Sequence, residues 1–131
     1  MKRIMFDTNI FDKLITDQFF PDVWQAADSG RLIIVTCEIQ ELEISRINDS
    51  RKRRLIQSIP RQVIASVSTN SDHQATPDLI IAHTAAAHCE MFVTEDRRLL
   101  GWYQEHYGGK PCYDYQEFIS WFLRYTPDSL Q

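Results

Sequence analysis

The chain has 131 residues, of which 44% are hydrophobic and 24% charged, and its formal net charge is -4. We expect one domain over residues 1–131, because a chain of this length buries enough apolar surface to fold without disulfides or a structural metal. The negative net charge argues against a protein that binds nucleic acid by bulk positive charge.

Three cysteines, Cys37, Cys89 and Cys112, are widely spaced, and the chain contains no CxxC pair. An odd number without clustering argues against a disulfide framework and against a cysteine zinc site. No apolar run is long enough for a membrane span or for the core of a signal peptide. We therefore expect a cytoplasmic protein without a membrane segment.

In the first half of the chain, apolar runs alternate with segments that have helical spacing. Pro21 is a helix-start signal, Gly30 is a stop signal, and Asp49 or Ser50 can cap a helix. In the segment 37–47 we expect Ile39, Leu42 and Ile47 to face inward. The expected strands are 2–6 and 31–36, and the expected helices are 8–15, Pro21 to Gly30, 37–47 and 49–59.

The second half continues the alternation after a polar loop at 69–76. Thr76 and Pro77 have the residue types of an N-cap and a first helical position. The expected strands are 61–68, 91–94 and a short one within 111–115, and the expected helices are 76–89, one within 95–108, and 116–125. This order predicts a three-layer α/β sandwich with a mostly parallel central sheet flanked by helices.

In open α/β sheets, ligands bind beyond the carboxyl ends of the strands. Carboxylates occur at or near several of these places: Asp7, Glu41 with Glu38 as a possible substitute, Asp78 and Asp96. Taken singly, each has an ordinary explanation as a helix cap, a turn residue or a solvated side chain. Together, several carboxylates with no histidine or cysteine nearby form a set of oxygen ligands that suits Mg²⁺ or Mn²⁺. Such an ion points to metal-assisted phosphodiester hydrolysis.

The chain also resembles the PIN-domain ribonucleases, and within them the VapC-type toxins of toxin–antitoxin pairs. The resemblance rests on "FDTN", "VTCEIQEL", "PDLIIAHTAA" and "VTEDRRL", in that order. It implies a PIN-like fold, a metal-dependent endoribonuclease, a homodimer and a small antitoxin partner. The implied Mg²⁺ or Mn²⁺ ligands and catalytic residues are Asp7, Glu41, Asp78 and Asp96, with Asn9 and Thr94 as supporting residues.

Two features bear on this resemblance. Family members often have a further acid two residues after the position of Asp96, where this chain has Arg98. The chain also has basic residues that can contact the RNA backbone, although such residues are commonly surface charges. These candidate RNA-binding residues are Arg51, Arg53, Arg54, Arg97 and Arg98.

Two alternatives belong to other functional classes. The first is a catalytically weak or inactive PIN-like module that binds RNA or a partner, which Arg98 and the negative net charge leave open. The second is another α/β phosphoryl-transfer protein, such as a receiver domain or a haloacid-dehalogenase-type phosphatase. Asn9 stands where such a phosphatase needs a second aspartate, and Lys110 is a poor candidate for the lysine of a receiver domain.

Overall fold

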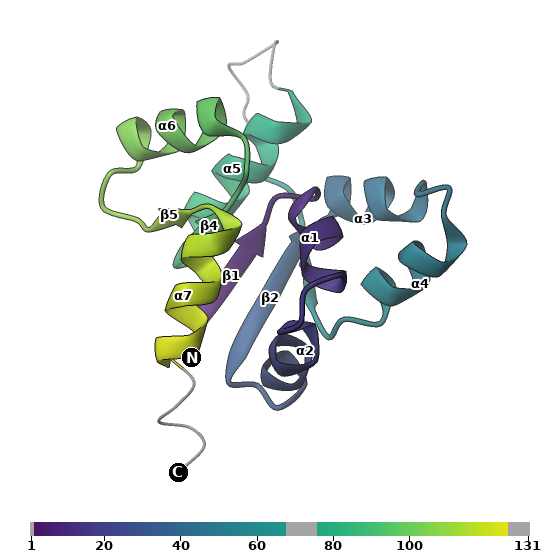
Figure 1. The fold of residues 1–131 in the computed structure, drawn as a ribbon. Helices are drawn as coiled ribbons and strands as arrows, with labels where there is room; N and C mark the ends of the chain where they lie inside the picture. Colours follow the sequence, from purple (N-terminus) through teal and green to yellow (C-terminus); the bar gives the residue numbers. More distant parts are fainter. Residues whose placement is uncertain (1, 68–75, 126–131) are drawn as a thin grey trace.

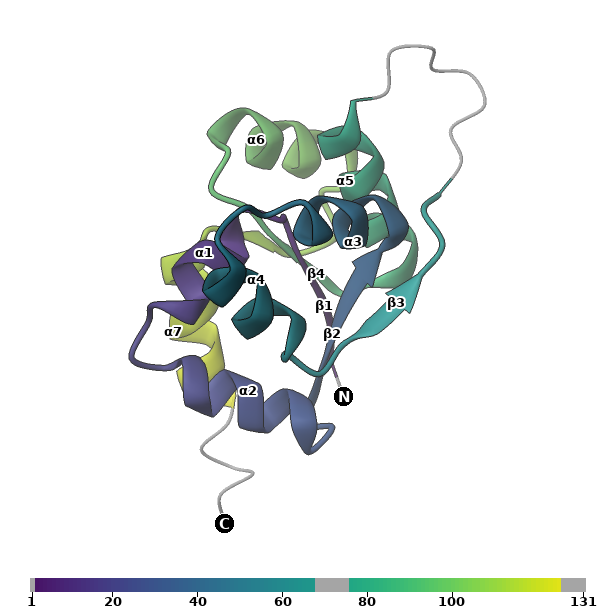
Figure 2. The same ribbon diagram turned by 90° about the vertical axis from the view of Figure 1, so that its right-hand side faces the viewer.

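The computed structural model describes residues 2–67 and 76–125, so the predicted loop lies almost entirely outside the described residues. The five described strands form one parallel sheet in the order β3-β2-β1-β4-β5, with β5 labelled in Figure 1 and β3 in Figure 2. The expectation of a mostly parallel sheet is therefore confirmed. The strands are β1 (Lys2–Phe6), β2 (Leu32–Cys37), β3 (Gln62–Ile64), β4 (Met91–Val93) and β5 (Cys112–Tyr113).

Seven described helices flank the sheet (Figure 2). They are α1 (Ile10–Ile15), α2 (Phe20–Asp28), α3 (Glu38–Ser45), α4 (Ser50–Gln57), α5 (Pro77–His88), α6 (Arg97–His106) and α7 (Tyr115–Tyr125). None of the helices within the described ranges has the length and apolarity needed to cross a bilayer.

Alternation along the strands divides the core into two clusters, one on each face of the sheet. Ile4 and Phe6 of β1 pack in the cluster that includes residues of α1, α2, α4 and α7. Met5 points to the opposite face and joins the cluster of α5 and α6. The result is the three-layer sandwich that the alternation of strands and helices predicts.

Several helices begin where their capping residues predict. The Asp49 side chain accepts hydrogen bonds from two backbone N–H groups of α4, and Thr76 accepts one from Leu79 at the start of α5. Asp96 accepts two at the start of α6. Gly30, with φ of +80°, follows α2 and adopts the backbone conformation that glycine tolerates best.

The structure differs from the sequence-based expectation in one important helix. Leu42 of α3 is 51% exposed, so its predicted inward orientation is wrong. Ile44 is fully buried instead. The helix starts at Glu38 after Cys37, whose backbone N–H is accepted by the Gln40 side chain, and this start fixes which residues face the sheet.

Candidate functional site

The candidate site lies at the carboxyl end of β1, at the centre of the sheet. The backbone N–H of Asp7 donates to the carbonyl of Val93 (2.8 Å), which continues the pairing of β1 with β4. The hydroxyl of the fully buried Thr94 donates to Oδ2 of Asp7 (2.9 Å). The same hydroxyl accepts the N–H of Asp96 (3.1 Å). Thr94 therefore links Asp7 to the start of α6.

Asp7 is a buried carboxyl group, with 6% of its surface exposed. Burial raises the pKa of Asp7, and the neighbouring carboxylates of Asp78 and Glu43 raise it further. The hydrogen bond from Thr94 acts in the opposite direction on this pKa. Acidic side chains from α3 and α5 therefore act on Asp7 at this end of the sheet.

Helix α3 approaches Asp7 with two polar side chains. Gln40, which is fully buried, donates from Nε2 to the carbonyl of Phe6, the residue before Asp7. One turn further along the helix, Oε1 of Glu43 accepts the hydroxyl of Thr8 at 2.6 Å. The face of α3 that bears Gln40 and Glu43 is therefore the one turned toward the end of β1.

Glu41, the predicted ligand from α3, has other partners. Its carboxylate accepts Nε and Nη2 of Arg61, at 2.7 and 2.8 Å, and the hydroxyl of Thr36 at 2.6 Å. These donors hold the pKa of Glu41 below its usual value, with Arg61 as the largest cause. The role of Glu41 as a metal ligand stays a prediction, and the structure shows its carboxylate bound to Arg61.

The other predicted residues lie at helix starts. Asp78 is exposed in the first turn of α5, close enough to Asp7 to raise its pKa. Asp96 is exposed, and its Oδ1 accepts the N–H groups of Arg98 and Leu99 at 3.0 and 3.2 Å as the cap of α6. Asn9 is exposed at the N-cap position of α1.

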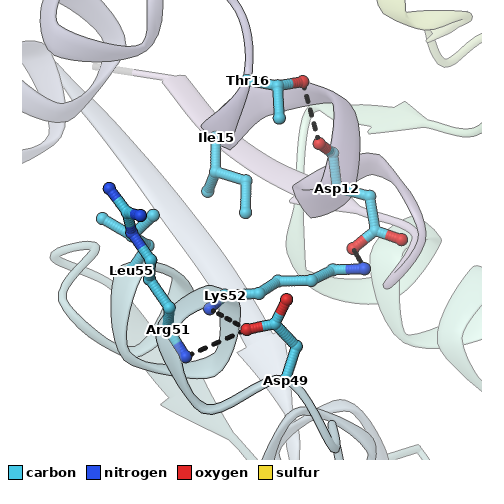
Figure 3. A pocket seen from close by; sticks show the side chains of 7 residues that line it. All are labelled: Asp12, Ile15, Thr16, Asp49, Arg51, Lys52 and Leu55. Carbon is cyan, nitrogen blue, oxygen red and sulfur yellow. Dashed lines mark hydrogen bonds and ion pairs between the residues drawn. The ribbon is translucent and has the colours of Figure 1, made fainter.

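The basic helix α4 packs beside α1. Lys52 forms an ion pair with Asp12 of α1 at 2.8 Å and borders an open pocket of about 270 Å³ between the two helices (Figure 3). Arg51 and Arg54 are exposed, whereas Nη1 of Arg53 donates to the carbonyl of Ile47 at 2.6 Å.

The basic residues of α6 adjoin the candidate site, because they directly follow Asp96, the N-cap of this helix. Arg97 forms an exposed ion pair with Asp114 at 3.2 Å. Arg98 is exposed as well. Arg98 is therefore available to a ligand from solvent, while Arg97 has an acidic partner.

The donor set is compatible with a hard divalent cation. The negative charge of Asp78 helps to raise the pKa of Asp7, and a cation between the two carboxylates would offset that effect. Within residues 2–67 and 76–125, no three acidic, histidine or cysteine side chains form a ready-made metal cage. Mg²⁺ in proteins is commonly held by one or two carboxylates together with water and substrate phosphate, which two carboxylates suffice to provide.

Comparison of the fold with solved structures identifies its type. The PIN-domain endonuclease Utp24 superimposes with a TM-score of 0.58 over 86% of this chain and 84% of the other, at 15% identity. The chain has the PIN-domain fold. A structure of VapBC2 from Rickettsia felis, bound to a DNA fragment from its promoter, superimposes with a TM-score of 0.56 at 14% identity. The match covers 86% of this chain and 98% of the other.

A further match is a domain of a functionally unknown protein from Methanocaldococcus jannaschii, with a TM-score of 0.54 and 14% identity over 87% of this chain and 91% of the other. No family model and no curated relative matches the sequence. The resemblance in fold that the sequence motifs predict is confirmed, and at such identities the likeness concerns the fold.

Sequence reasoning missed the polar residues that surround the predicted ones. Gln40 and Glu43 of α3 contact Phe6 and Thr8, on either side of Asp7, and Arg61 binds Glu41. Glu43 carried a signal, since it lies two positions after Glu41 and so points to the other side of the helix. Arg61 carried none, because its partner is distant in sequence.

Proposed function

We propose that the protein is a metal-dependent endoribonuclease that hydrolyses RNA phosphodiester bonds, as the toxin of a toxin–antitoxin pair. The observation that carries this proposal is Asp7, a buried carboxylate at the central strand end whose pKa is raised by burial and by Asp78 and Glu43. Keeping these groups ionised together calls for a cation. The PIN-domain fold supports the proposal because one solved structure with that fold is described as an endonuclease.

In this proposal Asp7 and Asp78 hold Mg²⁺ or Mn²⁺, and Asp96 is a third predicted ligand. A bound divalent ion supplies a more acidic water and stabilises charge on the phosphoryl group. Thr94 fixes the orientation of Asp7 by donating to Oδ2, and it fixes the backbone of Asp96 by accepting its N–H. Glu41 is the remaining predicted ligand, and its carboxylate is bound by Arg61.

The proposed RNA contacts are the exposed guanidinium groups of Arg51, Arg54 and Arg98, which suit the phosphate backbone. Arg53 and Arg97 belong to the same prediction, although each already has a protein partner. A homodimer and an antitoxin partner are also part of the proposal. The likeness of fold to the VapBC2 structure supports the antitoxin.

The decisive experiment is cleavage of a mixed RNA substrate with Mg²⁺ or Mn²⁺, with and without EDTA. We expect cleavage that stops on chelation and is lost in Asp7→Asn and strongly reduced in Asp78→Asn. Asp22→Asn is a matched control, because Asp22 also follows a proline in the first turn of a helix but lies in α2, at the other end of the sheet (Figure 1). Cleavage that survives chelation, or that survives Asp7→Asn, contradicts the proposal.

A second candidate is a non-catalytic PIN-like module that binds RNA or a protein partner. It is favoured by one observation, the engagement of Glu41 by Arg61, which removes a predicted ligand from the site. Calorimetric titration with Mn²⁺ separates the two candidates. Binding that Asp7→Asn abolishes supports the nuclease, and an absence of binding at millimolar metal supports the module.

A further inference from the structure

Helix α3 carries three glutamates, Glu38, Glu41 and Glu43, and the last two lie on different sides of the helix. Successive residues of an α-helix are rotated by about 100°, so residues two apart lie about 200° apart around the axis. Glu41 and Glu43 therefore project to nearly opposite sides. A residue three positions earlier, by contrast, lies close to the same side, which places Gln40 with Glu43.

The contacts of the helix show which side faces the site. Gln40 donates to the carbonyl of Phe6, directly before Asp7, and Glu43 accepts the hydroxyl of Thr8, directly after it. Both residues on this side of α3 thus form hydrogen bonds with the residues on either side of Asp7. The Glu43 carboxylate is also near enough to raise the pKa of Asp7.

The other side of the helix is turned toward β2 and the segment before β3. Glu41 accepts Thr36, from β2, and both Nε and Nη2 of Arg61, from the turn that precedes β3. Arg61 is anchored in turn by donating Nη1 to the carbonyls of Gln57 and Ile59, at 2.9 and 3.0 Å. Glu41 therefore ties α3 to the end of α4.

The apolar residues agree with this rotation of the helix. Ile44, next to Glu43, is fully buried in the cluster that contains Phe6, whereas Leu42, next to Glu41, is 51% exposed. Turning Glu41 toward Asp7 would require withdrawing Ile44 from the core and breaking the contacts of Gln40 and Glu43. Packing and polar contacts thus fix the same orientation independently.

We propose that Glu43, oriented by Thr8, is the carboxylate that α3 contributes to the Asp7 site, and that Glu41 is a structural residue. This inference rests on the proposed metal-dependent function and assigns a further residue to it. In the proposal, Thr8 is a positioning residue, because its hydroxyl donates to Glu43 and it is adjacent to Asp7. The oxygen donors at the site then come from the end of β1, from α3 and α5, and, with Asp96, from the start of α6.

The test measures Mn²⁺ affinity by calorimetry, and thermal stability in metal-free buffer, for Glu43→Gln and Glu41→Gln. We expect Glu43→Gln to lower the affinity by about tenfold or more, as loss of a ligand or of its support does, and to leave the melting temperature equal or higher. We expect Glu41→Gln instead to lower the melting temperature by several degrees, because Arg61 loses its carboxylate partner.

Two controls keep the assignment specific. Asp22→Asn removes the same charge from the far end of the protein and measures the effect of net charge on Mn²⁺ binding. Thr8→Val is expected to weaken Mn²⁺ binding and Thr8→Ser to restore it, since serine keeps the hydroxyl that donates to Glu43. A role of Thr8 in packing alone does not predict this rescue.

The outcomes distinguish this inference from the proposed function. If the wild type binds Mn²⁺ and cleaves RNA while Glu43→Gln binds the ion as tightly, the inference is wrong and the function stands. A loss of Mn²⁺ affinity in Glu41→Gln but not in Glu43→Gln likewise restores Glu41 as the ligand. If the wild type neither binds Mn²⁺ nor cleaves RNA, the proposed function and the inference are both overturned.

Discussion

The pair formed by Glu41 and Arg61 is expected to contribute strongly to stability, and its removal is the most direct test of the structure. The perturbation is Glu41→Gln, which keeps the size of the side chain and removes its charge. The side chains of Arg61 and Glu41 are 15% and 26% exposed, so this is not an ordinary surface ion pair. Its two N–H···O contacts, at 2.7 and 2.8 Å, have the paired geometry that makes arginine–carboxylate bonds strong.

The magnitude follows from what the substitution leaves behind. A hydrogen bond to a charged group contributes about 1.5–3 kcal/mol, and partial exposure lowers this value through water and salt. Glutamine can keep one acceptor, so we expect the free energy of unfolding to fall by about 1–3 kcal/mol. For a chain of this length, the melting temperature then falls by about 4–12 °C.

A double-mutant cycle isolates the pair. Arg61→Gln is expected to cost more than Glu41→Gln, because Arg61 also donates to the carbonyls of Gln57 and Ile59. Each single variant already breaks the pair, so the double variant loses less stability than the sum of the two single losses. We expect a coupling energy of about 1–2 kcal/mol from urea unfolding. A coupling energy near zero refutes the reasoning, because it shows that the two charges do not stabilise one another in solution.

The same pair has a signature in pH. The pKa of Glu41 is held below its ordinary value of 4.5 in the folded protein, so the folded state binds fewer protons here than the unfolded state. The stability that Glu41 contributes is therefore present above its unfolded pKa and is lost as pH falls through the folded pKa. We expect the difference in unfolding free energy between wild type and Glu41→Gln to shrink below about pH 4.5.

Three further predictions concern the site and the basic helix. Thr94→Val removes the hydrogen bonds to Asp7 and Asp96 and is expected to cost about 1–3 kcal/mol in chemical denaturation, with Thr94→Ser as the control that retains them. The pKa of Asp7 is raised from 3.8 in the folded protein, so ionisation of Asp7 disfavours folding. The unfolding free energy of Asp7→Asn, relative to that of wild type, should therefore rise with pH through the folded pKa and then level off. A difference that does not change with pH contradicts this prediction. If Arg51 and Arg54 contact RNA phosphates, replacing both by Gln should reduce the salt slope of RNA binding by about 1.4, at about 0.7 for each contact, and an unchanged slope excludes them.

The sheet and the residues at its strand ends could be predicted from the sequence because strands have little freedom. Residues alternate strictly between the two faces, so the apolar run Ile4–Phe6 fixes both its own burial and the position of Asp7 beyond it. Thr94 follows β4 in the same way, and the parallel register of β1 with β4 brings its hydroxyl to Asp7. Each position follows from local sequence and one topological rule.

Helix α3 could not be predicted in the same way, because its apolar residues pack on two different clusters. Ile44 belongs to the cluster with Phe6, whereas Ile39 packs against the cluster on the opposite face of the sheet. A helix that contacts both cores has no single apolar side, so the pattern in "EIQELEI" permits more than one rotation about its axis. The rotation is set by distant partners, namely Phe6, Thr8 and Arg61.

A motif in a helix therefore specifies a segment with more certainty than it specifies a side chain. The motif "VTCEIQEL" correctly places an acidic helix after β2 and beside Asp7. Within that helix, a rotation of about 100° per residue decides whether a carboxylate reaches the strand end or the turn before β3. Glu41 fits the motif and Glu43 fits the contacts. The contacts carry more weight because the buried Ile44 and Gln40 hold the helix in the orientation that directs Glu43 to Asp7.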